Sequence, residues 1–179
     1  MPNNETSQPD STATIHRPDW AFLLQHPAHL IALGFGSGLS PKAPGTFGTL
    51  FAWISFVLLN LVFNDFAWAF VIAVSFATGL WACQHTATRL NIQDPGSVVW
   101  DEVVAFWIVL WIIMPASFWQ QMLAFALFRL FDAVKYGPVA WADQTFKGWG
   151  YKGAFGIMFD DLIAAFLTLV VMATIRFLF

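Results

Sequence analysis

Charged side chains are scarce in this sequence of 179 residues. Only 11% of the chain is charged and 58% is hydrophobic, whereas ordinary soluble domains contain about 25% charged residues. A soluble fold of this size has too much surface to hide so much apolar material. The composition therefore excludes an ordinary soluble domain and favours a protein whose solvent is the lipid bilayer.

Three further absences narrow the possibilities. The net charge is −3 and the sequence contains no basic run, which argues against a nucleic-acid partner. The single cysteine, Cys83, excludes an intrachain disulfide. The beginning of the chain lacks a basic segment followed by an apolar core, so we expect no cleaved signal peptide. Instead, we expect a polar tail over residues 1–29, followed by a membrane-embedded domain over residues 30–179.

Apolar stretches recur along the rest of the chain. They cover residues 47–63, 66–83, 103–114, 118–131 and 162–179. A membrane-spanning helix needs about 20 apolar residues, and the first, second and fifth stretches come close to this length. All five should be helical, because an open strand would leave backbone groups unpaired in lipid. The pattern predicts an all-α, multi-spanning membrane protein with about four to five membrane helices.

The basic residues predict the orientation in the membrane. If the N-terminus is cytoplasmic, only Arg176 lies on the far side, and the other basic residues lie inside. Those residues are Arg17, Lys42, Arg89, Arg129, Lys135, Lys147 and Lys152. This asymmetry follows the positive-inside tendency of membrane proteins. The polar segments 34–49, 84–102 and 132–161 then all face the cytoplasm.

The first polar segment reads GFGSGLSPKAPGTFGT and contains several glycines. Glycines such as Gly45 and Gly48 let backbone N–H groups approach an anion closely. Lys42 adds a positive charge, and Thr46 and Thr49 add hydroxyl groups. The Gly-Lys-Ser/Thr ending of a Walker loop is missing, so a simple connector before a membrane helix remains an equal alternative.

Carboxylates gather in the other two polar segments. Asp101 and Glu102 precede an apolar helix, and so do Asp160 and Asp161. Helix capping could explain either pair, since carboxylates favour helix N-termini. Two adjacent carboxylates at a membrane boundary repel each other, however, and ionisable residues at membrane depth usually have a function.

Arg129, Asp132 and Lys135 are spaced so that they lie along one helix face. A mutual salt bridge is the structural alternative. Asp132 is expected near a helix C-terminus, where the helix dipole disfavours an anion. Taken together, the carboxylates suit a hard cation such as Mg²⁺, and the basic residues suit a phosphate. The sequence thus indicates phosphoryl chemistry at one membrane face.

One other motif points to a different chemistry. Cys83 and Arg89 have the C-x5-R spacing of cysteine phosphatases. No glycine lies between them to form a phosphate-binding loop, and on a continuous helix the two side chains would diverge. We therefore expect the match to be accidental. His26 and His29 have no carboxylate nearby in the sequence, and we interpret them as ordinary interfacial residues.

Four blocks, in this order and spacing, resemble the phosphatidylglycerophosphatase A family. They are GFGSGLSPKAPGTFGTL, GSVVWDEVVAFW, FRLFDAVK and GIMFDD. The resemblance runs from about Leu30 to about Ala165. It implies a Mg²⁺-dependent enzyme of the bacterial inner membrane that converts phosphatidylglycerophosphate to phosphatidylglycerol.

The resemblance also marks a set of site residues. Its metal ligands would be Asp101, Glu102, Asp132, Asp160 and Asp161, and the catalytic carboxylates would be among Asp160, Asp161, Asp132 and Asp101. Its substrate-binding residues would be Lys42, Gly45, Thr46, Gly48, Arg129 and Lys135. Tyr136 and Gly137 separate Lys135 from a proline that directly follows the lysine in most members, and the segment 141–153 is several residues longer than usual.

Several alternatives remain open from the sequence. Any of the carboxylates could act as the general base, and a covalent aspartyl phosphate is also compatible with the residues. The substrate could be another lipid phosphate or a polyprenyl phosphate. A non-enzymatic membrane carrier usually places its ionisable residues near the midplane of the bilayer. Here they gather at one face, which favours the enzyme. The expected partners are the lipid substrate and the bilayer, and the sequence leaves the oligomeric state undetermined.

Overall fold

The computed structural model describes residues 17–134, 137–146 and 148–178, and within these ranges it contains helices and no strand. The elements are α1 (Trp20–Leu24), α2 (Pro27–Ala32), the 3-10 segment η1 (Gly34–Leu39), α3 (Pro44–Leu59), α4 (Asp65–Leu90), α5 (Trp100–Ile113), α6 (Phe118–Val134), α7 (Pro138–Thr145) and α8 (Tyr151–Leu178). The all-α prediction is confirmed for these residues.

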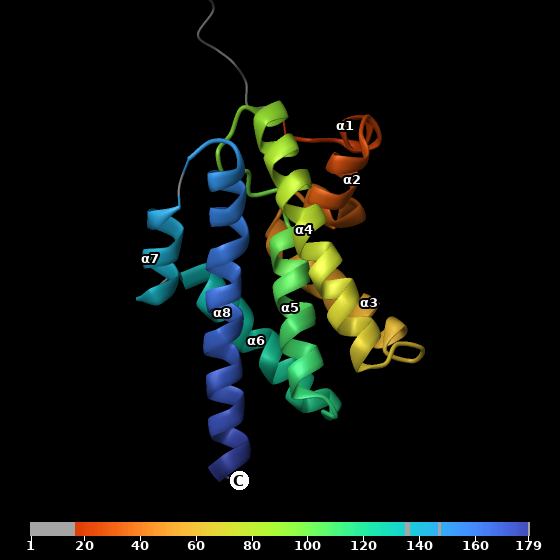
Figure 1. The fold of residues 1–179 in the computed structure, drawn as a ribbon, viewed down its shortest axis with the longest axis vertical. Coiled ribbons are helices and arrows are strands. Elements are labelled where there is room, and N and C mark those ends of the chain that lie inside the picture. The colour runs from red at the N-terminus through yellow and green to blue at the C-terminus, as the bar shows by residue number, and fades with distance from the viewer. Residues whose placement is uncertain (1–16, 135–136, 147, 179) are drawn as a thin grey trace, which may run out of the picture.

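Helix α5 lies at the centre of the bundle and packs against α3, α4 and α8 (Figure 1). It is apolar on nearly every face, which is the pattern of a helix surrounded by other helices. Two indole groups tie it to its neighbours: Trp107 Nε1 donates to the Ala52 carbonyl of α3 at 3.0 Å, and Trp100 Nε1 donates to the Ser75 carbonyl of α4 at 3.0 Å. The first turn of α5 is thereby buried, together with its two carboxylates.

Two helices are long and apolar enough to cross a membrane, namely α4 with 26 residues and α8 with 28 residues. At 1.5 Å per residue each is about 40 Å long, more than the roughly 30 Å thickness of the hydrocarbon core. Helix α3 is apolar but has only 16 residues, and α5 has only 14. The prediction of four to five membrane helices is thus supported for two of them, and the full number stays a prediction.

Large apolar side chains cover the outer faces of α3, α4 and α8. Examples are Ile54, Phe66, Phe70, Phe166 and Phe177, whose exposed fractions range from 55% to 89%. So much exposed apolar surface is unusual for a soluble monomer. It fits contact with lipid chains.

Helix α8 begins well before the apolar stretch that predicted it. The pattern indicated a helix from Leu162, with Asp160 and Asp161 at its start, but α8 starts at Tyr151. Gly153 and Gly156 make the early start possible, because a Cβ at either position would collide with the backbone carbonyl of Gly148 or Phe146. Both aspartates therefore lie inside the helix, where capping cannot explain them.

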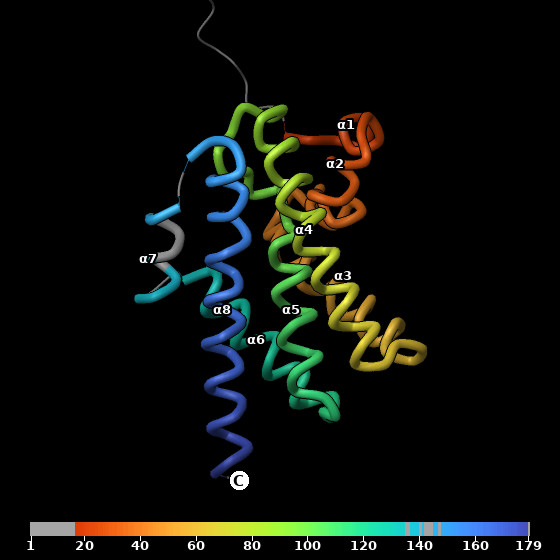
Figure 2. Tube along the Cα trace, in the orientation of Figure 1, coloured from red at the N-terminus to blue at the C-terminus, as the bar shows by residue number. Residues whose placement is uncertain are grey.

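The described part of the predicted N-terminal tail contains helices. Within residues 17–32, α1 and α2 form and α2 packs against α4 (Figure 2). His29 is buried, and its Nδ1 donates to the Phe22 carbonyl at 2.9 Å. Burial lowers the pKa of His29 below its usual range, so the ring stays neutral at neutral pH. The boundary at residue 29 thus divides a helix that belongs to the bundle.

The glycine at position 48 makes a specific stability prediction. A Cβ at Gly48 would lie 2.7 Å from the Val99 Cβ, so α3 can approach the start of α5 only without a side chain there. We expect Gly48→Ala to lower the free energy of unfolding by about 1–3 kcal/mol through overpacking, although alanine is ordinarily about 1 kcal/mol better than glycine inside a helix. Thermal unfolding of the purified protein in detergent measures the effect.

Gly96→Ala is the matched control for that measurement. A Cβ at Gly96 meets nothing within 4 Å. This variant should unfold at the wild-type temperature. Equal stability of the two variants would contradict the close approach of α3 to Val99.

Candidate active site

Five carboxylates from three helices meet in the upper half of the bundle. Asp101 and Glu102 come from the first turn of α5, Asp132 from the last turns of α6, and Asp160 and Asp161 from α8. Each of the five is at most 9% exposed. Buried carboxylates are costly unless they are paired, hydrogen-bonded or bound to a cation. The structure thus brings all five of the predicted metal ligands into one buried region.

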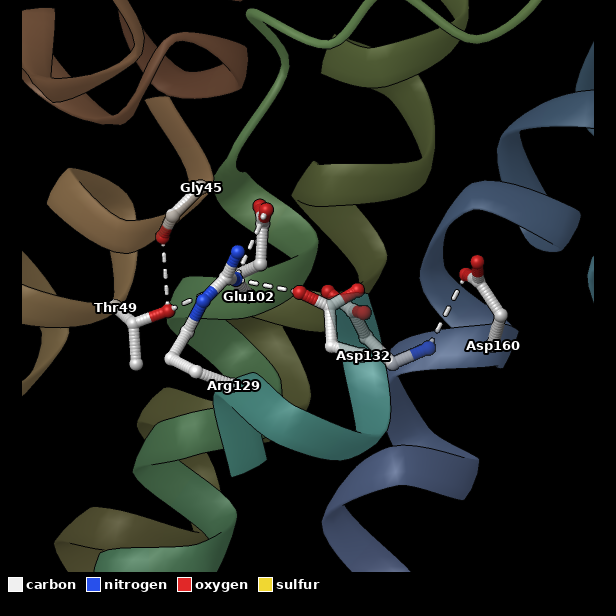
Figure 3. A network of polar contacts seen from close by, with 7 residues as sticks. Gly45, Thr49, Glu102, Arg129, Asp132 and Asp160 are labelled. Carbon is white, nitrogen blue, oxygen red and sulfur yellow. Dashed lines mark hydrogen bonds and ion pairs between the residues drawn. The ribbon is translucent and has the colours of Figure 1, made fainter. Parts of the chain in front are cut away.

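Arg129 of α6 is the basic partner of this cluster. Its guanidinium lies 2.5 Å from Asp132 and 3.6 Å from Glu102, and its Nη1 donates to the Thr49 hydroxyl at 3.4 Å. Figure 3 shows Arg129 between these three side chains. The salt bridge to Asp132 that the sequence left as an alternative therefore exists, and it is part of the cluster rather than separate from it.

Gly45 and Thr49 bring α3 to the same place. The Thr49 hydroxyl donates to the Gly45 carbonyl at 2.9 Å while it accepts from Arg129. A Cβ at Gly45 would collide with the Glu102 carboxylate and lie 3.0 Å from the Arg129 guanidinium. Gly45 therefore allows the cluster to sit directly beneath the first turn of α3, which is a packing role the sequence did not distinguish from anion binding.

The oxygens of Asp101, Glu102 and Asp161 are suited to hold one divalent cation. These three side chains each offer an oxygen within 4.8 Å of the others. Oxygens on opposite sides of an octahedral Mg²⁺ are about 4 Å apart, since each bond is about 2.1 Å. One buried oxygen of each residue has no hydrogen-bond partner: Asp101 Oδ1, Glu102 Oε2 and Asp161 Oδ2. The donor set, its burial and its unpartnered oxygens all fit a hard cation.

The excess of negative charge in the cluster also favours a bound cation. The charge of Asp161 interacts unfavourably with those of Asp132 and Glu102, and among the residues that the structure describes only Arg129 forms an ion pair with the cluster. One guanidinium cannot compensate the four carboxylates of Asp101, Glu102, Asp132 and Asp161. A bound divalent cation would supply two of the three missing positive charges.

Arg129 also has a hydrogen-bond donor that is not used within the described residues. Its Nε is buried and has no acceptor among the described residues. A buried donor left without a partner costs about 1–3 kcal/mol. A phosphate oxygen at this position would satisfy it with a charge-assisted hydrogen bond.

Asp160 and Asp161 are adjacent in the chain but face different surroundings. Asp161 belongs to the three-oxygen group, whereas Asp160 lines a cavity of about 240 Å³ that Gln93 and Asp94 also line. Figure 3 shows Asp160 to one side of the ion-paired network. Sequence reasoning assigned no role to Gln93 or Asp94. Their only signal was a polar loop directly before the Asp101 block, and nothing in the sequence showed that this loop borders α8.

Three other predicted substrate-binding residues, Lys42, Thr46 and Gly48, lie outside the cluster. Lys42 is exposed in the loop before α3 and forms no ion pair with any residue in the described ranges. The Thr46 backbone N–H donates to the Ala43 carbonyl at 3.0 Å, and Gly48 packs on Val99. Lys135 lies outside the described residues.

Cys83 is fully buried in the hydrophobic core, and α4 continues unbroken past it to Leu90. Arg89 is exposed on the last turn of the same helix. A cysteine nucleophile needs an accessible, electropositive loop around the phosphate. The Cys83–Arg89 pair forms no such loop.

The fold and the cluster together define a class of protein. The chain is an all-helical, membrane-type protein whose buried centre combines carboxylates with a guanidinium, the groups from which phosphoryl-transfer sites are built. Residues 30–176 match the Phosphatidylglycerophosphatase A family. The chain belongs to this family and is a phosphatase, that is, a phosphoric monoester hydrolase.

Curated relatives cover most of the chain. A protein named Phosphatidylglycerophosphatase A from Haemophilus influenzae is 41% identical over 155 residues, which are 86% of this chain and 91% of that protein. A protein of the same name from Escherichia coli is 38% identical over 146 residues, 81% of each chain. A provisionally named phosphatidylinositol-3-phosphatase from Bacteroides thetaiotaomicron is 40% identical over 156 residues, 82% of this chain and 92% of that protein. No solved structure is significantly similar.

The burial of Cys83 makes a direct prediction. Cys83→Ser should retain nearly all phosphatase activity, because the thiol is buried on an unbroken helix and no phosphate-binding loop surrounds it. A cysteine nucleophile would instead lose several orders of magnitude, since no other group would supply the attacking atom. Initial rates on a lipid phosphate, with folding checked by gel filtration in detergent, distinguish the two cases.

Proposed function

We propose that this protein is a Mg²⁺-dependent lipid phosphatase that hydrolyses phosphatidylglycerophosphate to phosphatidylglycerol and phosphate. The observation that carries the proposal is the buried group of Asp101, Glu102 and Asp161, with its unpartnered oxygens, beside Arg129. The two relatives named Phosphatidylglycerophosphatase A supply the headgroup. The lipid stays in the bilayer and presents its terminal phosphate to the centre from the side.

Asp101, Glu102 and Asp161 would hold the Mg²⁺ ion. When bound, the ion supplies positive charge for the phosphoryl oxygens and lowers the pKa of a bound water molecule. Asp132 does not have to bind the ion, because its carboxylate already holds the Arg129 guanidinium.

Arg129 binds the phosphate of the substrate. Asp132 and Thr49 both contact the Nη1 atom of its guanidinium, and the buried Nε is bonded to neither of them. A preorganised donor of this kind stabilises charge that develops on the phosphoryl oxygens without reorganising during the reaction. Lys42 and Lys135 stay predictions as further phosphate ligands.

Asp160 accepts a proton from the attacking water. It is the carboxylate of the five that borders the cavity beside Gln93 and Asp94, so water in that cavity can reach it. A general base has to lie within hydrogen-bond reach of the proton that it removes.

A second headgroup is compatible with the comparisons. The relative from Bacteroides thetaiotaomicron carries a phosphatidylinositol-3-phosphatase name at nearly the same identity. Rates of the purified protein on phosphatidylglycerophosphate, phosphatidylinositol 3-phosphate, phosphatidic acid and a polyprenyl phosphate decide between them. Fastest turnover of phosphatidylglycerophosphate supports the proposal, and fastest turnover of any other substrate overturns its headgroup.

Substitutions of the two aspartates of α8 should affect Mg²⁺ affinity and turnover differently. Asp161→Asn removes a cation ligand, so we expect Mg²⁺ affinity to fall by at least about tenfold and the rate by at least about 100-fold. Asp160→Asn should lower the rate by a similar factor while Mg²⁺ affinity stays close to that of the wild type. Calorimetric titration with Mg²⁺ and initial rates on the lipid phosphate measure the two quantities, and a chelator should abolish turnover reversibly.

Asp65→Asn is the control for this pair. Asp65 lies in the first turn of α4, at the opposite end of the bundle, and accepts from Trp111 Nε1 at 3.2 Å, which an asparagine oxygen can also do. It should behave as the wild type. The catalytic assignment is falsified if folded Asp160→Asn and Asp161→Asn both turn over at wild-type rates, or if turnover survives the chelator.

The orientation in the membrane has its own test. We propose that the protein lies in the bacterial inner membrane with the carboxylate end of the bundle in the cytoplasm, because seven of the eight basic residues fall on that side of the predicted topology. In a Cys83→Ser background, Gly96→Cys should react with a membrane-impermeant thiol reagent only after cells are opened. Val62→Cys, in the loop between α3 and α4 at the other end, should react in intact cells. The reverse pattern would invert the orientation.

A further inference from the structure

A second polar pocket lies between the C-terminal end of α4 and the N-terminal end of α8. It has a volume of about 320 Å³ and is lined by Trp81, Gln84, His85, Thr88, Arg89 and Tyr151. None of these residues belongs to the carboxylate cluster or lines the cavity beside Asp160. The pocket is therefore separate from the candidate active site. It adjoins the end of α4 and the start of α8, which lie side by side in the bundle (Figure 1).

Arg89 gives this pocket a positive charge that the protein does not neutralise. It is exposed on the last turn of α4 and forms no ion pair with the residues described here. Two neighbours one turn back, Gln84 and His85, present further hydrogen-bonding groups to the same space. The Nε2 atom of His85 is buried and has no hydrogen-bond partner in the described chain. Such a set is suited to an anion that accepts several hydrogen bonds.

His85 is held in place by an aromatic stack. Its ring lies 4.3 Å from that of His26, with the planes 19° apart, and His26 in turn lies 5.8 Å from Trp81. The Nδ1 of His26 accepts from the Ala28 backbone N–H at 3.1 Å and fixes this ring at the start of α2. This side of the pocket is thus preorganised, which lowers the entropy that the protein loses when a ligand binds.

The position of the pocket along the helices indicates what it meets. Helices α4 and α8 are the two that can span a membrane, and the pocket is bounded by the end of one and the start of the other. Trp81 and Tyr151 border it, and both residue types favour the membrane–water interface. The pocket therefore lies at the depth of the lipid headgroups, where basic pockets between membrane helices bind anionic lipids.

We propose that this pocket binds the phosphodiester headgroup of an anionic phospholipid that is not the substrate being hydrolysed. Arg89 pairs with the phosphate, Gln84 and His85 donate to its oxygens, and Trp81 packs against the glycerol backbone toward the bilayer. This site depends on the membrane location of the two helices and on no part of the catalytic proposal. Because the product of the proposed reaction is itself an anionic phospholipid, the enzyme could retain one such molecule outside its active site.

Native mass spectrometry tests the proposal with defined lipids. The full-length protein is purified in a neutral detergent and titrated with phosphatidylglycerol, with phosphatidylcholine or with inorganic phosphate. Wild type should retain phosphatidylglycerol, and Arg89→Gln should weaken this retention by at least about tenfold, since a charge-assisted pair is lost. Lys152→Gln is the matched control, because it removes the same charge from an exposed neighbour of Tyr151 that does not line the pocket.

Four outcomes would overturn the site. The first is an equal loss of phosphatidylglycerol retention in Arg89→Gln and Lys152→Gln, and the second is retention of phosphatidylcholine as strong as that of phosphatidylglycerol. The third is displacement of the lipid by inorganic phosphate at equal concentration. The fourth is loss of phosphatidylglycerol retention in Asp161→Asn. The last result would place the retained lipid in the active site instead. Arg89→Gln should also keep wild-type turnover in neutral micelles, so a loss of lipid retention is separable from a loss of catalysis or of folding.

Discussion

Five carboxylates buried among apolar helices impose an electrostatic cost that the rest of the structure has to meet. Moving a single ion out of water costs several kcal/mol even after the protein relaxes. Arg129 compensates part of this charge through Asp132 and Glu102, and three oxygens remain without partners. The cation proposed above would relieve this imbalance. Stability and phosphoryl chemistry would then depend on the same interaction.

The surrounding helices are shaped by the need to close this centre. Gly45 and Gly48 let α3 lie directly on Glu102 and Val99, and Gly156 lets the segment at Phe146 cross α8. In a membrane, helix association is driven by close packing rather than by the hydrophobic effect, so small residues mark the contacts that matter. The glycines of the first motif act in this way in the structure: they bring helix backbones and the polar cluster together. Thr49 of α3 then accepts a hydrogen bond from Arg129 of the cluster and donates one to the Gly45 carbonyl of its own helix.

Prediction from the sequence succeeded for features that follow from the apolar composition and from the spacing of charged residues. The scarcity of charge indicated helices in lipid, and the described chain is helical with two spans of sufficient length. The four blocks indicated the family to which the chain belongs. The pairing of carboxylates with Arg129 was also foreseeable, because residues three apart on a helix are neighbours. The start of α8 was not, since the apolar pattern begins at Leu162 and glycine-rich sequence ordinarily argues against a helix.

What the sequence by itself determined is the kind of protein: apolar helices, one face rich in carboxylates and cations, and the residue types of a phosphoryl-transfer centre. These features follow from composition and local spacing, which can be read from a sequence before it folds. Only the tertiary structure decided which residues lie together. Asp161 lies close to Asp101 and Glu102, whereas Asp160 lines a cavity together with Asp94. The ring of His85 stacks on that of His26, in the pocket that Arg89 also lines. Adjacent side chains on a helix point about 100° apart, so the packing of neighbouring helices, which local sequence does not encode, determines what each side chain meets.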